Sequence, residues 1–457
     1  PYTSKKMKYG KLTPLAFALG MLFAGQSLAA GADTIVWDKN SALSRPSDLG
    51  KNLSIELSSG NNLWRPADYT MNGLDKLDTT KLIWKTVTTK EGAKYSLWVS
   101  GNTVMYIDEF IDRADGVRRF GSSHAQEASL TNSYVRETGT GDLYMYNNTI
   151  KQVSIKAGAE LTQLLFEKLT FPHLGDHNTI ESVENSGTIQ EIQVMADGID
   201  SNAASKIGEI KNHGKIGNIS SINIGTLSSD AGSIKSITMP TFQIDKIDLK
   251  GTALGDATAS RADGANGILV TGTGKIGTGQ GDAITIDANS SIAGFSIESL
   301  TEADGTVKQG VIDGDINIAG KVHEIDQGTG AENLTAGIVN LGTINGALKY
   351  SGADELTLIN HGTLKKTAAN DQANLVLSGT GTVRVKEWYV HIDGENVTQD
   401  TAMVVNGVDH LRVDKLVMTS IQNVVTEPGD PKFNLNYAVL DANNNLKAVS
   451  YTHLTLP

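Results

Sequence analysis

The stretches Val339-Asn340-Leu341-Gly342-Thr343-Ile344 and Ile359-Asn360-His361-Gly362-Thr363-Leu364 are two copies of one short pattern. In each copy, Asn-x-Gly follows an apolar residue and precedes Thr and a second apolar residue. Related copies occur at 184–189, at 211–216 and, more loosely, at 222–227. Successive Asn residues are 27 residues apart from 185 to 212 and 20 residues apart from 340 to 360. Repeats with periods of roughly 20–50 residues are typical of solenoid proteins.

The chemistry of this pattern favours a sharp corner between two strands. Asn and Gly both tolerate positive φ angles, and the aliphatic residue after the corner begins a strand with its side chain pointing inward. One turn cannot bury its own apolar face, so successive turns must stack, and the corner Asn amides then form a hydrogen-bonded ladder. The predicted corner residues are Asn185, Gly187, Asn212, Gly214, Asn223, Gly225, Asn340, Gly342, Asn360 and Gly362.

Residues 151–385 carry these repeats, and we expect them to form an all-β fold, a right-handed parallel β-helix of the pectin-lyase-like type. Strand-sized segments recur there between Gly, Asn, Asp and Ser, with one face apolar and the other polar. At roughly 20–27 residues and about 4.8 Å for each turn, the segment makes about 9–12 turns. The polar stretch 251–266 is expected to leave the coil as a loop, and the leucine spacing over 158–169 predicts a helix.

Residues 1–29 have the composition of a secretory signal peptide. A lysine-rich head precedes an apolar run from Leu12 to Ala24, and Ser27-Leu28-Ala29 is a small-x-small cleavage signal. We therefore expect cleavage between Ala29 and Ala30 and export of the chain. The alternative, a membrane anchor, needs about 20 apolar residues, which is more than this run provides. The basic residues of the head are Lys5, Lys6, Lys8 and Lys11.

The segments on either side of the repeats lack the pattern but are rich in β-forming residues. Residues 30–150 contain two expected hairpins, one around Gly101-Asn102 and one around Asn147-Asn148. We expect this region to be an N-terminal cap, because an open coil end exposes unpaired strand edges. Residues 386–448 are expected to form a C-terminal β segment or cap, and 449–457 a non-native tail.

The composition excludes several classes of protein. A formal net charge of −12 over 457 residues gives no electrostatic footprint for nucleic acid, so no nucleic-acid partner is expected. The chain has no cysteine, which excludes a disulfide scaffold, a thiolate zinc site and a thiol nucleophile. Because 39% of the residues are hydrophobic, the chain has enough apolar side chains to bury a core.

The signal peptide, the Asn-x-Gly-x-Ile/Leu repeats and the absence of cysteine together resemble the passenger of a bacterial autotransporter. The resemblance covers residues 184–385 by repeat texture and 386–448 more loosely. It implies passage through the outer membrane and display at the cell surface, most often for adhesion, aggregation or biofilm formation. The family's translocator, an outer-membrane β-barrel, is not in this sequence. The chain is therefore expected to be a fragment that precedes its own barrel, or to be secreted through a separate partner barrel.

Histidines and serines with possible chemical roles are scattered. His173 and His177 are four residues apart, but Pro172 interrupts any helix there, so a polar loop is expected instead of a metal pair. Gly121–His124 places a Ser beside a His but lacks the Gly-Asp-Ser-Gly-Ser motif of surface proteases. These observations predict no catalytic residue.

Two further patterns fall within the repeats. Gly277–Ile284 has a faint likeness to a calcium-binding nonapeptide, but Gln280 stands where a Gly is needed and no second copy exists. His213 and His361 occupy the variable position of the corner and are expected to face solvent. We therefore predict no metal-binding or cofactor-binding residue and no cofactor.

The function expected from the sequence is that of an exported structural or adhesive protein at the surface of a Gram-negative bacterium. Its partners would be host or bacterial surface ligands. Two alternatives remain open. A β-helix polysaccharide lyase or hydrolase would need three or more Asp or Glu residues converging with an Arg in one groove. An exoprotein would leave through a separate partner barrel.

Overall fold

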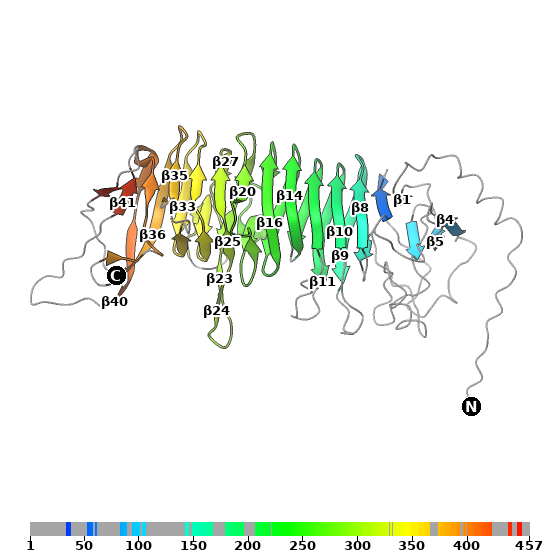
Figure 1. The fold of residues 1–457 in the computed structure, drawn as a ribbon, viewed down its shortest axis with the longest axis horizontal. Coiled ribbons are helices and arrows are strands. Elements are labelled where there is room, and N and C mark those ends of the chain that lie inside the picture. Colours follow the sequence, from blue (N-terminus) through cyan, green and yellow to red (C-terminus); the bar gives the residue numbers. More distant parts are fainter. Residues whose placement is uncertain are drawn as a thin grey trace, which may run out of the picture.

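Two columns of parallel strands form the body of the protein, and we describe them from a computed structural model (Figure 1). The structure describes residues 33–37, 53–57, 60–61, 83–88, 94–100, 103–106, 142–145, 149–167, 179–195, 206–220, 222–328, 330, 332–365, 373–393, 396–398, 400–422, 437–440 and 446–449. The chain alternates between the two columns, so each turn adds one rung to each of two sheets. This is the expected parallel β-helix.

The first sheet contains, in chain order, β1 (Asp33–Trp37), β2 (Leu53–Leu57), β8 (Thr149–Ile155), β10 (Thr179–Asn185), β12 (Lys206–Asn212), β14 (Asn223–Asp230), β16 (Gln243–Lys250), β19 (Lys275–Ile276), β20 (Asp282–Ile286), β25 (Val311–Asp313), β26 (Asp315–Ile318), β31 (Thr343–Asn345), β32 (Leu348–Tyr350), β34 (Thr363–Lys365), β35 (Leu375–Leu377), β38 (Val405–Asn406) and β41 (Tyr437–Leu440). These strands pair in parallel, and β42 (Leu446–Val449) pairs antiparallel to β41.

The second sheet contains β3 (Gly60–Asn61), β7 (Asp142–Met145), β9 (Ala159–Glu167), β11 (Thr188–Met195), β13 (Lys215–Ser220), β15 (Ser233–Met239), β17 (Ala253–Leu254), β18 (Gly267–Val270), β21 (Ser291–Ala293), β22 (Phe295–Ile297), β27 (Lys321–His323), β30 (Ile338–Asn340), β33 (Leu356–Asn360), β36 (Val383–Asp393), β39 (Leu411–Val413) and β40 (Leu416–Gln422). A short strand, β37 (Asn396–Val397), pairs antiparallel to the end of β36.

Columns of aliphatic side chains fill the space between the two sheets. In the first sheet, one such column places each residue in register with its counterpart on the next turn, and all of its members are at most 1% exposed. Its members are Ile180, Ile207, Ile224, Ile244, Ile276, Ile312, Ile344 and Leu364. Burial of each such side chain contributes about 1.5–3 kcal/mol to the free energy of folding. Because every turn adds one member to the column, the stacked turns form a continuous hydrophobic core.

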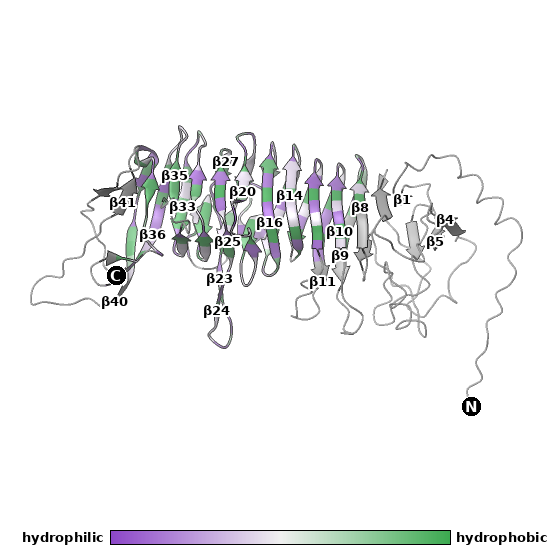
Figure 2. Cartoon of the chain, in the orientation of Figure 1, coloured by the Kyte–Doolittle hydropathy of each residue, from purple (hydrophilic) through white to green (hydrophobic). Residues whose placement is uncertain are grey.

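Figure 2 shows this segregation as alternating hydrophilic and hydrophobic bands along strands such as β10 and β16. In β10, Ile180 and Val183 are buried, while Glu181 between them is exposed. The inward residues are therefore three apart at this point. The registers of β10 with β8 and β12 skip the position of Glu181, as expected where a strand bends.

This bend explains why the predicted helix over 158–169 is wrong. Residues 159–167 form the strand β9, which pairs in parallel with β11. Leu161 and Leu164 are buried and lie in register with Ile189 and Ile192. A bent strand places apolar side chains at i and i+3, and the same spacing is one of the signals of an amphipathic helix.

The structure confirms one of the two hairpins expected in residues 30–150. Within the antiparallel sheet of β4 (Ile83–Thr88), β5 (Lys94–Ser100) and β6 (Thr103–Tyr106), the last two strands pair around residues 101 and 102. The hairpin expected around residues 147 and 148 is wrong, because β7 joins the second sheet and β8 joins the first. Those two strands are separate rungs of the coil.

The coil is longer than residues 151–385. At its N-terminal end, β1 and β2 pair in parallel with each other, and β2 pairs with β8. At its C-terminal end, β36 pairs in parallel with β39 and β40, and β38 pairs with β35. These rungs lack the Asn-x-Gly corner, so the repeat pattern did not reveal them.

Loops leave the coil at several turns. The strands β23 (Ser299–Thr301) and β24 (Val307–Gln309) form an antiparallel arm that projects sideways from the rod (Figure 1). The strands β28 (Ile325–Asp326) and β29 (Thr335–Ala336) form a second hairpin. Of the expected loop 251–266, Ala253 and Leu254 belong to the coil as β17, and the rest contains the 3-10 turn η3 (Arg261–Asp263). Another 3-10 turn, η4 (Val408–His410), precedes β39.

Candidate functional site

The corner from the first sheet to the second sheet contains a ladder of buried polar side chains. The Asn185 side-chain amide donates to Asn212 Oδ1 at 2.8 Å, and that of Asn212 donates to Ser229 Oγ at 3.0 Å. Thr252 Oγ1 donates to Ser229 Oγ at 3.0 Å, and Ser290 Oγ accepts from the Thr252 backbone at 3.0 Å. The predicted Asn ladder is present, and hydroxyl side chains continue it over three more turns.

A second ladder lies at the opposite edge of the coil, where the chain passes from the second sheet to the first. Asn340 ends β30 and Asn360 ends β33, and the Asn340 amide donates to Asn360 Oδ1 at 2.7 Å. The rung after Asn360 is Trp388, which is fully buried and donates from Nε1 to Thr401 O at 2.8 Å. One sequence pattern thus builds both kinds of corner.

The third copy of the pattern is not a corner, which corrects the prediction for Asn223 and Gly225. Asn223 begins β14 and accepts a hydrogen bond from the Gln243 backbone at 3.1 Å. Gly225 lies within β14, where a Cβ would be 2.3 Å from the carbonyl oxygen of Gly208 on the preceding turn. Gly225 therefore allows close stacking at a mid-strand position.

The corner glycines are required for the same reason and not for their φ angles. The sequence pattern predicts positive φ angles at these corners, but neither Gly187 nor Gly214 has one. A Cβ on Gly214 would be 2.1 Å from Gly187 O, and one on Gly362 would be 2.1 Å from Gly342 O. Each corner backbone lies directly against the carbonyl of the previous turn, and only Gly permits that approach.

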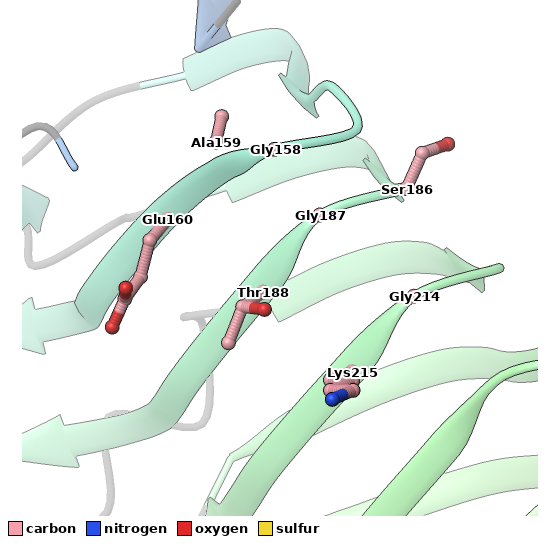
Figure 3. Close-up of a pocket in the computed structure, with 8 residues that line it drawn as sticks. All are labelled: Gly158, Ala159, Glu160, Ser186, Gly187, Thr188, Gly214 and Lys215. Carbon is pink, nitrogen blue, oxygen red and sulfur yellow. The ribbon is translucent and has the colours of Figure 1, made fainter. Parts of the chain in front are cut away.

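An open trough follows the first corner across three successive turns (Figure 3), and its volume is about 300 Å³. Glu160, Thr188 and Lys215 occupy equivalent rungs and lie in a row along it. The residues that precede them on these rungs are Ala159, Gly187 and Gly214, so the adjacent strip carries no side chain larger than a methyl group. The lining residues are Gly158, Ala159, Glu160, Ser186, Gly187, Thr188, Gly214 and Lys215.

The polar side chains of the trough have few partners. Glu160 accepts a hydrogen bond from the side chain of Gln190 on the next turn. Within the part of the chain that the structure describes, the side chains of Ser186, Thr188 and Lys215 make no hydrogen bond or ion pair. Ser186 and Lys215 are exposed and Thr188 is half-buried. The trough therefore offers one cation and two hydroxyls, next to a carboxylate.

A second polar cluster lies on the outer face of the second sheet near its C-terminal end. His361 stacks on Tyr389 with ring centroids 3.7 Å apart and planes 9° apart. His361 Nε2 is 2.7 Å from Glu387 Oε1, and Lys415 Nζ donates to Glu387 Oε2 at 2.9 Å. The His361 side chain is only 15% exposed, so the expectation that it faces solvent is wrong.

Burial and the neighbouring charges shift the pKa values of His361 and Glu387 in opposite directions. Burial lowers the pKa of the His361 imidazole below its usual 6.5, although the neighbouring Glu387 carboxylate opposes the shift. The pKa of Glu387 is lowered, because burial, which would raise it, is outweighed by the contacts with Lys415 and His361. Burial raises the pKa of the Tyr389 phenol, and Glu387 adds to that shift. The stable state is thus a neutral imidazole beside a lysine-paired carboxylate.

Between the trough and this cluster, two loops cover the outer face of the second sheet. Arg261 is 6% exposed and donates from Nη2 to Ile268 O at 3.1 Å and to Gln327 Oε1 at 3.3 Å. Gln327 also accepts from Ser296 Oγ on β22 at 2.9 Å. Burial raises the pKa of Glu298, and the charge of Arg261 opposes that shift. This network holds the two loops against β22.

The other residues singled out in the sequence provide no organised site. His213 is exposed at its corner, with Nδ1 3.1 Å from Asp230 O. Gly277 and Gly279 are coil residues whose backbone amides donate to Ile244 O and Asp313 O, each at 2.8 Å. Among the residues that the structure describes, no group of three or more His, Asp and Glu side chains is placed to hold a metal ion.

Several sequence-based predictions lie outside the described residues. These are the cleavage position at Ala29 and Ala30, the pair His173 and His177, and Gly121–His124. The described residues also include no helix of the length and apolar character needed to cross a membrane.

The sequence did not reveal the trough or the His361 cluster. Glu387 and Tyr389 are 26 and 28 residues after His361, and only the stacking register places them beside it. The small residues Ala159, Gly187 and Gly214 did offer a signal for the trough, since they stack into a column almost without side chains. Comparisons of the chain with protein-family models, with curated proteins and with solved structures find no match.

Proposed function

We propose that this protein is an exported, surface-displayed scaffold of the autotransporter-passenger kind, which binds ligands on host or bacterial surfaces. The observation that carries the proposal is the two-sheet coil, whose outward faces are largely polar and whose interior is aliphatic over the turns between β8 and β40. A rod of this kind extends a binding surface away from its point of attachment. The expected signal peptide and the resemblance of the repeats add support for export.

The absence of cysteine fits this proposal, because the coil is held together without covalent links. Parallel backbone pairing between turns, the buried side-chain columns and the polar ladders all act between neighbouring rungs. Such a molecule folds turn by turn as it emerges, without disulfide formation. This property suits a chain that folds after leaving the cell, whether its barrel is its own or a separate partner.

An enzyme acting on polysaccharide is the second candidate, and one observation favours it. Glu324, Glu387 and Asp414 lie on the same region of the second sheet as Arg384, which meets the number and types of residues that such an enzyme needs. Each is already neutralised, however: Arg384 pairs with Asp414 at 2.6 Å, Lys386 with Glu324 at 3.3 Å and Lys415 with Glu387 at 2.9 Å. A ladder of paired surface charges explains the arrangement without catalysis.

Display and adhesion test the proposed function. The chain, with its N-terminal leader, is joined to an outer-membrane translocator and expressed in a non-adherent bacterium. We expect surface exposure, shown by protease accessibility, and binding to host cells or to abiotic surfaces above that of cells carrying the translocator alone. Surface exposure without any gain in adhesion or aggregation would contradict the adhesive role. Retention of the chain inside the cell would contradict export.

A further inference from the structure

We propose that the β28–β29 hairpin is a clasp, which joins five successive turns of the coil into one cooperative block and opens without breaking either sheet. The inference goes beyond the adhesive role proposed above and holds whether or not the rod binds a surface. It begins with the place of the hairpin in the chain. The hairpin is inserted between β27 and β30 of the second sheet, and its two strands pair only with each other. Neither sheet therefore depends on it for backbone pairing.

Backbone pairing in the second sheet connects neighbouring turns only. The five turns around the hairpin contain, in order, β18, β22, β30, β33 and β36. In a coil held together in this way, a turn at the end of the stack leaves by breaking a single interface. Contacts that reach beyond the next turn are therefore the ones that make several turns unfold together.

Gln327 directly follows β28, is fully buried and connects the hairpin to the two preceding turns. Its Oε1 atom accepts from Ser296 Oγ on β22 at 2.9 Å and from Arg261 Nη2 at 3.3 Å. Arg261 belongs to the loop before β18, and its Nη2 also donates to the backbone of that strand at 3.1 Å. The Gln327 amide nitrogen donates to Ala336 O on β29 at 2.8 Å. One side chain thus links the two hairpin strands and reaches two turns towards the N-terminus.

The other end of the hairpin reaches equally far towards the C-terminus. The backbone amide of Gly337 donates to Thr357 Oγ1 on β33 at 2.8 Å, and Lys386 Nζ on β36 donates to Thr335 O at 2.6 Å. Between these polar contacts, apolar side chains of the hairpin pack on the outer face of β30 and β33 in a small buried cluster of Leu334, Ala336, Val339 and Ile359. The clasp therefore extends from the turn of β18 to the turn of β36, two turns on either side of its own.

A buried charge opposes closure of the clasp. Arg261 is only 6% exposed, and its Nε has no hydrogen-bond partner among the described residues. In the same part of the chain, no carboxylate forms an ion pair with its guanidinium. Burying a guanidinium in this way costs free energy, because water that would solvate the charge is excluded. When the hairpin lifts, Arg261 regains water and no sheet pairing is lost, so the clasp opens more readily than the turns separate.

Hydrogen exchange of the full chain, followed by mass spectrometry of peptides from each turn, tests the coupling. The test variant is Gln327→Ala, which removes the bonds to Ser296 and Arg261, and Gln327 makes no hydrogen bond to β36. The matched control is Gln309→Ala, at the base of the other hairpin, where the side chain bonds only to Thr343 on the next turn. Circular dichroism shows whether both variants keep the fold.

We expect Gln327→Ala to increase the exchange rates of β18 and β36 at least about tenfold, and Gln309→Ala to leave them unchanged. The rates in β10 and β12, outside the block, should stay as in the wild-type chain. Faster exchange confined to the hairpin and β22 would overturn the proposal, because the effect would then be local. Equal acceleration in β10 and β12 would also overturn it, because the whole coil would then be destabilised. If Gln327→Ala does not fold, Lys386→Met replaces it, with faster exchange of β18 as the expected result.

A single introduced cysteine shows whether the clasp opens on an intact coil, since the chain has no cysteine of its own. Val339 and Ile338 are neighbours on β30 and both are 0% exposed, but Val339 lies under the hairpin and Ile338 faces the interior of the coil. With a small alkylating reagent, Val339→Cys is expected to react at least about tenfold faster than Ile338→Cys, and faster still when combined with Gln327→Ala. Equal rates for the two single variants would show that the site is uncovered only when the turns separate, and would overturn the clasp.

Discussion

At the scale of single residues, the molecule depends on positions where the backbone of one turn touches that of the next. Corner and mid-strand glycines share this role, although their neighbours in sequence differ. Gly208, Gly217 and Gly225 lie within strands, and a Cβ on any of them would be within 2.6 Å of a carbonyl oxygen on the preceding turn. Gly is therefore required at these positions because a Cβ would collide with the preceding turn, and not because the backbone needs a conformation that other residues avoid.

Replacing a corner glycine tests this directly. Gly214→Ala is expected to destabilise the coil by about 3 kcal/mol or more, because the new methyl group collides with backbone that is itself hydrogen-bonded and cannot retreat. Gly330→Ala is the matched control, since nothing lies within 4 Å of a Cβ there. Urea unfolding followed by circular dichroism gives both values. Equal stabilities for the two variants would contradict the close-approach explanation.

Substitution in the polar ladder gives a second prediction. Asn212→Ala removes the acceptor of the Asn185 amide and of the Gly214 backbone amide, and it removes the donor to Ser229. We expect a loss of about 2–4 kcal/mol of unfolding free energy, since three hydrogen bonds of about 1 kcal/mol each are lost at a buried corner. Asn289→Ala, at an exposed corner position, is expected to change the unfolding free energy by less than about 0.5 kcal/mol. A small effect at Asn212 would show that the ladder is not a source of stability.

The His361 cluster predicts a dependence of stability on pH. The folded-state pKa of His361 lies below its usual 6.5. The neutral imidazole therefore contributes its full share to the free energy of unfolding above pH 6.5, and this share is lost as the pH falls through the folded-state pKa. The wild-type chain should therefore unfold at lower urea at pH 5.5 than at pH 7.5. His361→Gln should reduce that difference, whereas His213→Gln, at an exposed corner, should leave it in place. A difference unchanged by His361→Gln would contradict this account.

At the scale of elements, the coil tolerates variation wherever the chain leaves it. The hydrogen bonds of the ladders join residues separated by 17 to 38 positions, yet the rungs they connect remain in register. The extra residues of the longer turns lie in loops and arms that leave the coil, such as β23–β24. In that arm the side chains of Leu300 and Val307 are 48% and 56% exposed. Since these side chains bury little area, the arm contributes little to the stability of the coil.

Shortening the arm tests that independence. Replacing residues 301–307 with Asn-Gly joins Leu300 to Lys308 through a two-residue hairpin turn and keeps their existing pairing. We expect the melting temperature to change by less than about 2 °C, because the deleted residues contribute no buried core. A large fall in melting temperature would mean that the arm is part of the cooperative unit.

The sequence predicted the elements unevenly, and the reasons are physical. The Asn-x-Gly pattern predicted a stacked coil and its amide ladders, because both follow from local chemistry and from the spacing of the copies. It did not show that Asn185 and Asn340 occupy opposite corners, since both corners need the same backbone approach. It also suggested a helix at 158–169, where a bent strand places Leu161 and Leu164 three residues apart.

The candidate sites were harder to predict from the sequence than the coil. His361 and Tyr389 come together only through the register of β33 and β36, which contains an irregularity between Leu358 and Ile359. A shift of one residue would place Tyr389 on the other face of the sheet. A single sequence does not specify that irregularity, so the cluster had to be found in three dimensions.

At the scale of the whole molecule, the central claim is that successive turns stack in one fixed register. The chain has no cysteine, so a pair of introduced cysteines reports on that register without interference. Ser228 is in register with Asp248, and Asp248 with Thr285, along the outer face of the first sheet. Neighbouring turns are about 4.8 Å apart, within the roughly 4.4–6.8 Å between Cα atoms that a disulfide spans, whereas positions two turns apart exceed it.

Oxidation of two double variants, followed by thiol counting, is the most direct measurement. Ser228→Cys/Asp248→Cys is expected to form an intramolecular disulfide quantitatively under mild oxidation. Ser228→Cys/Thr285→Cys is expected to keep both thiols free. Failure of the first pair to close, or closure of the second as readily as the first, would contradict the stacked coil.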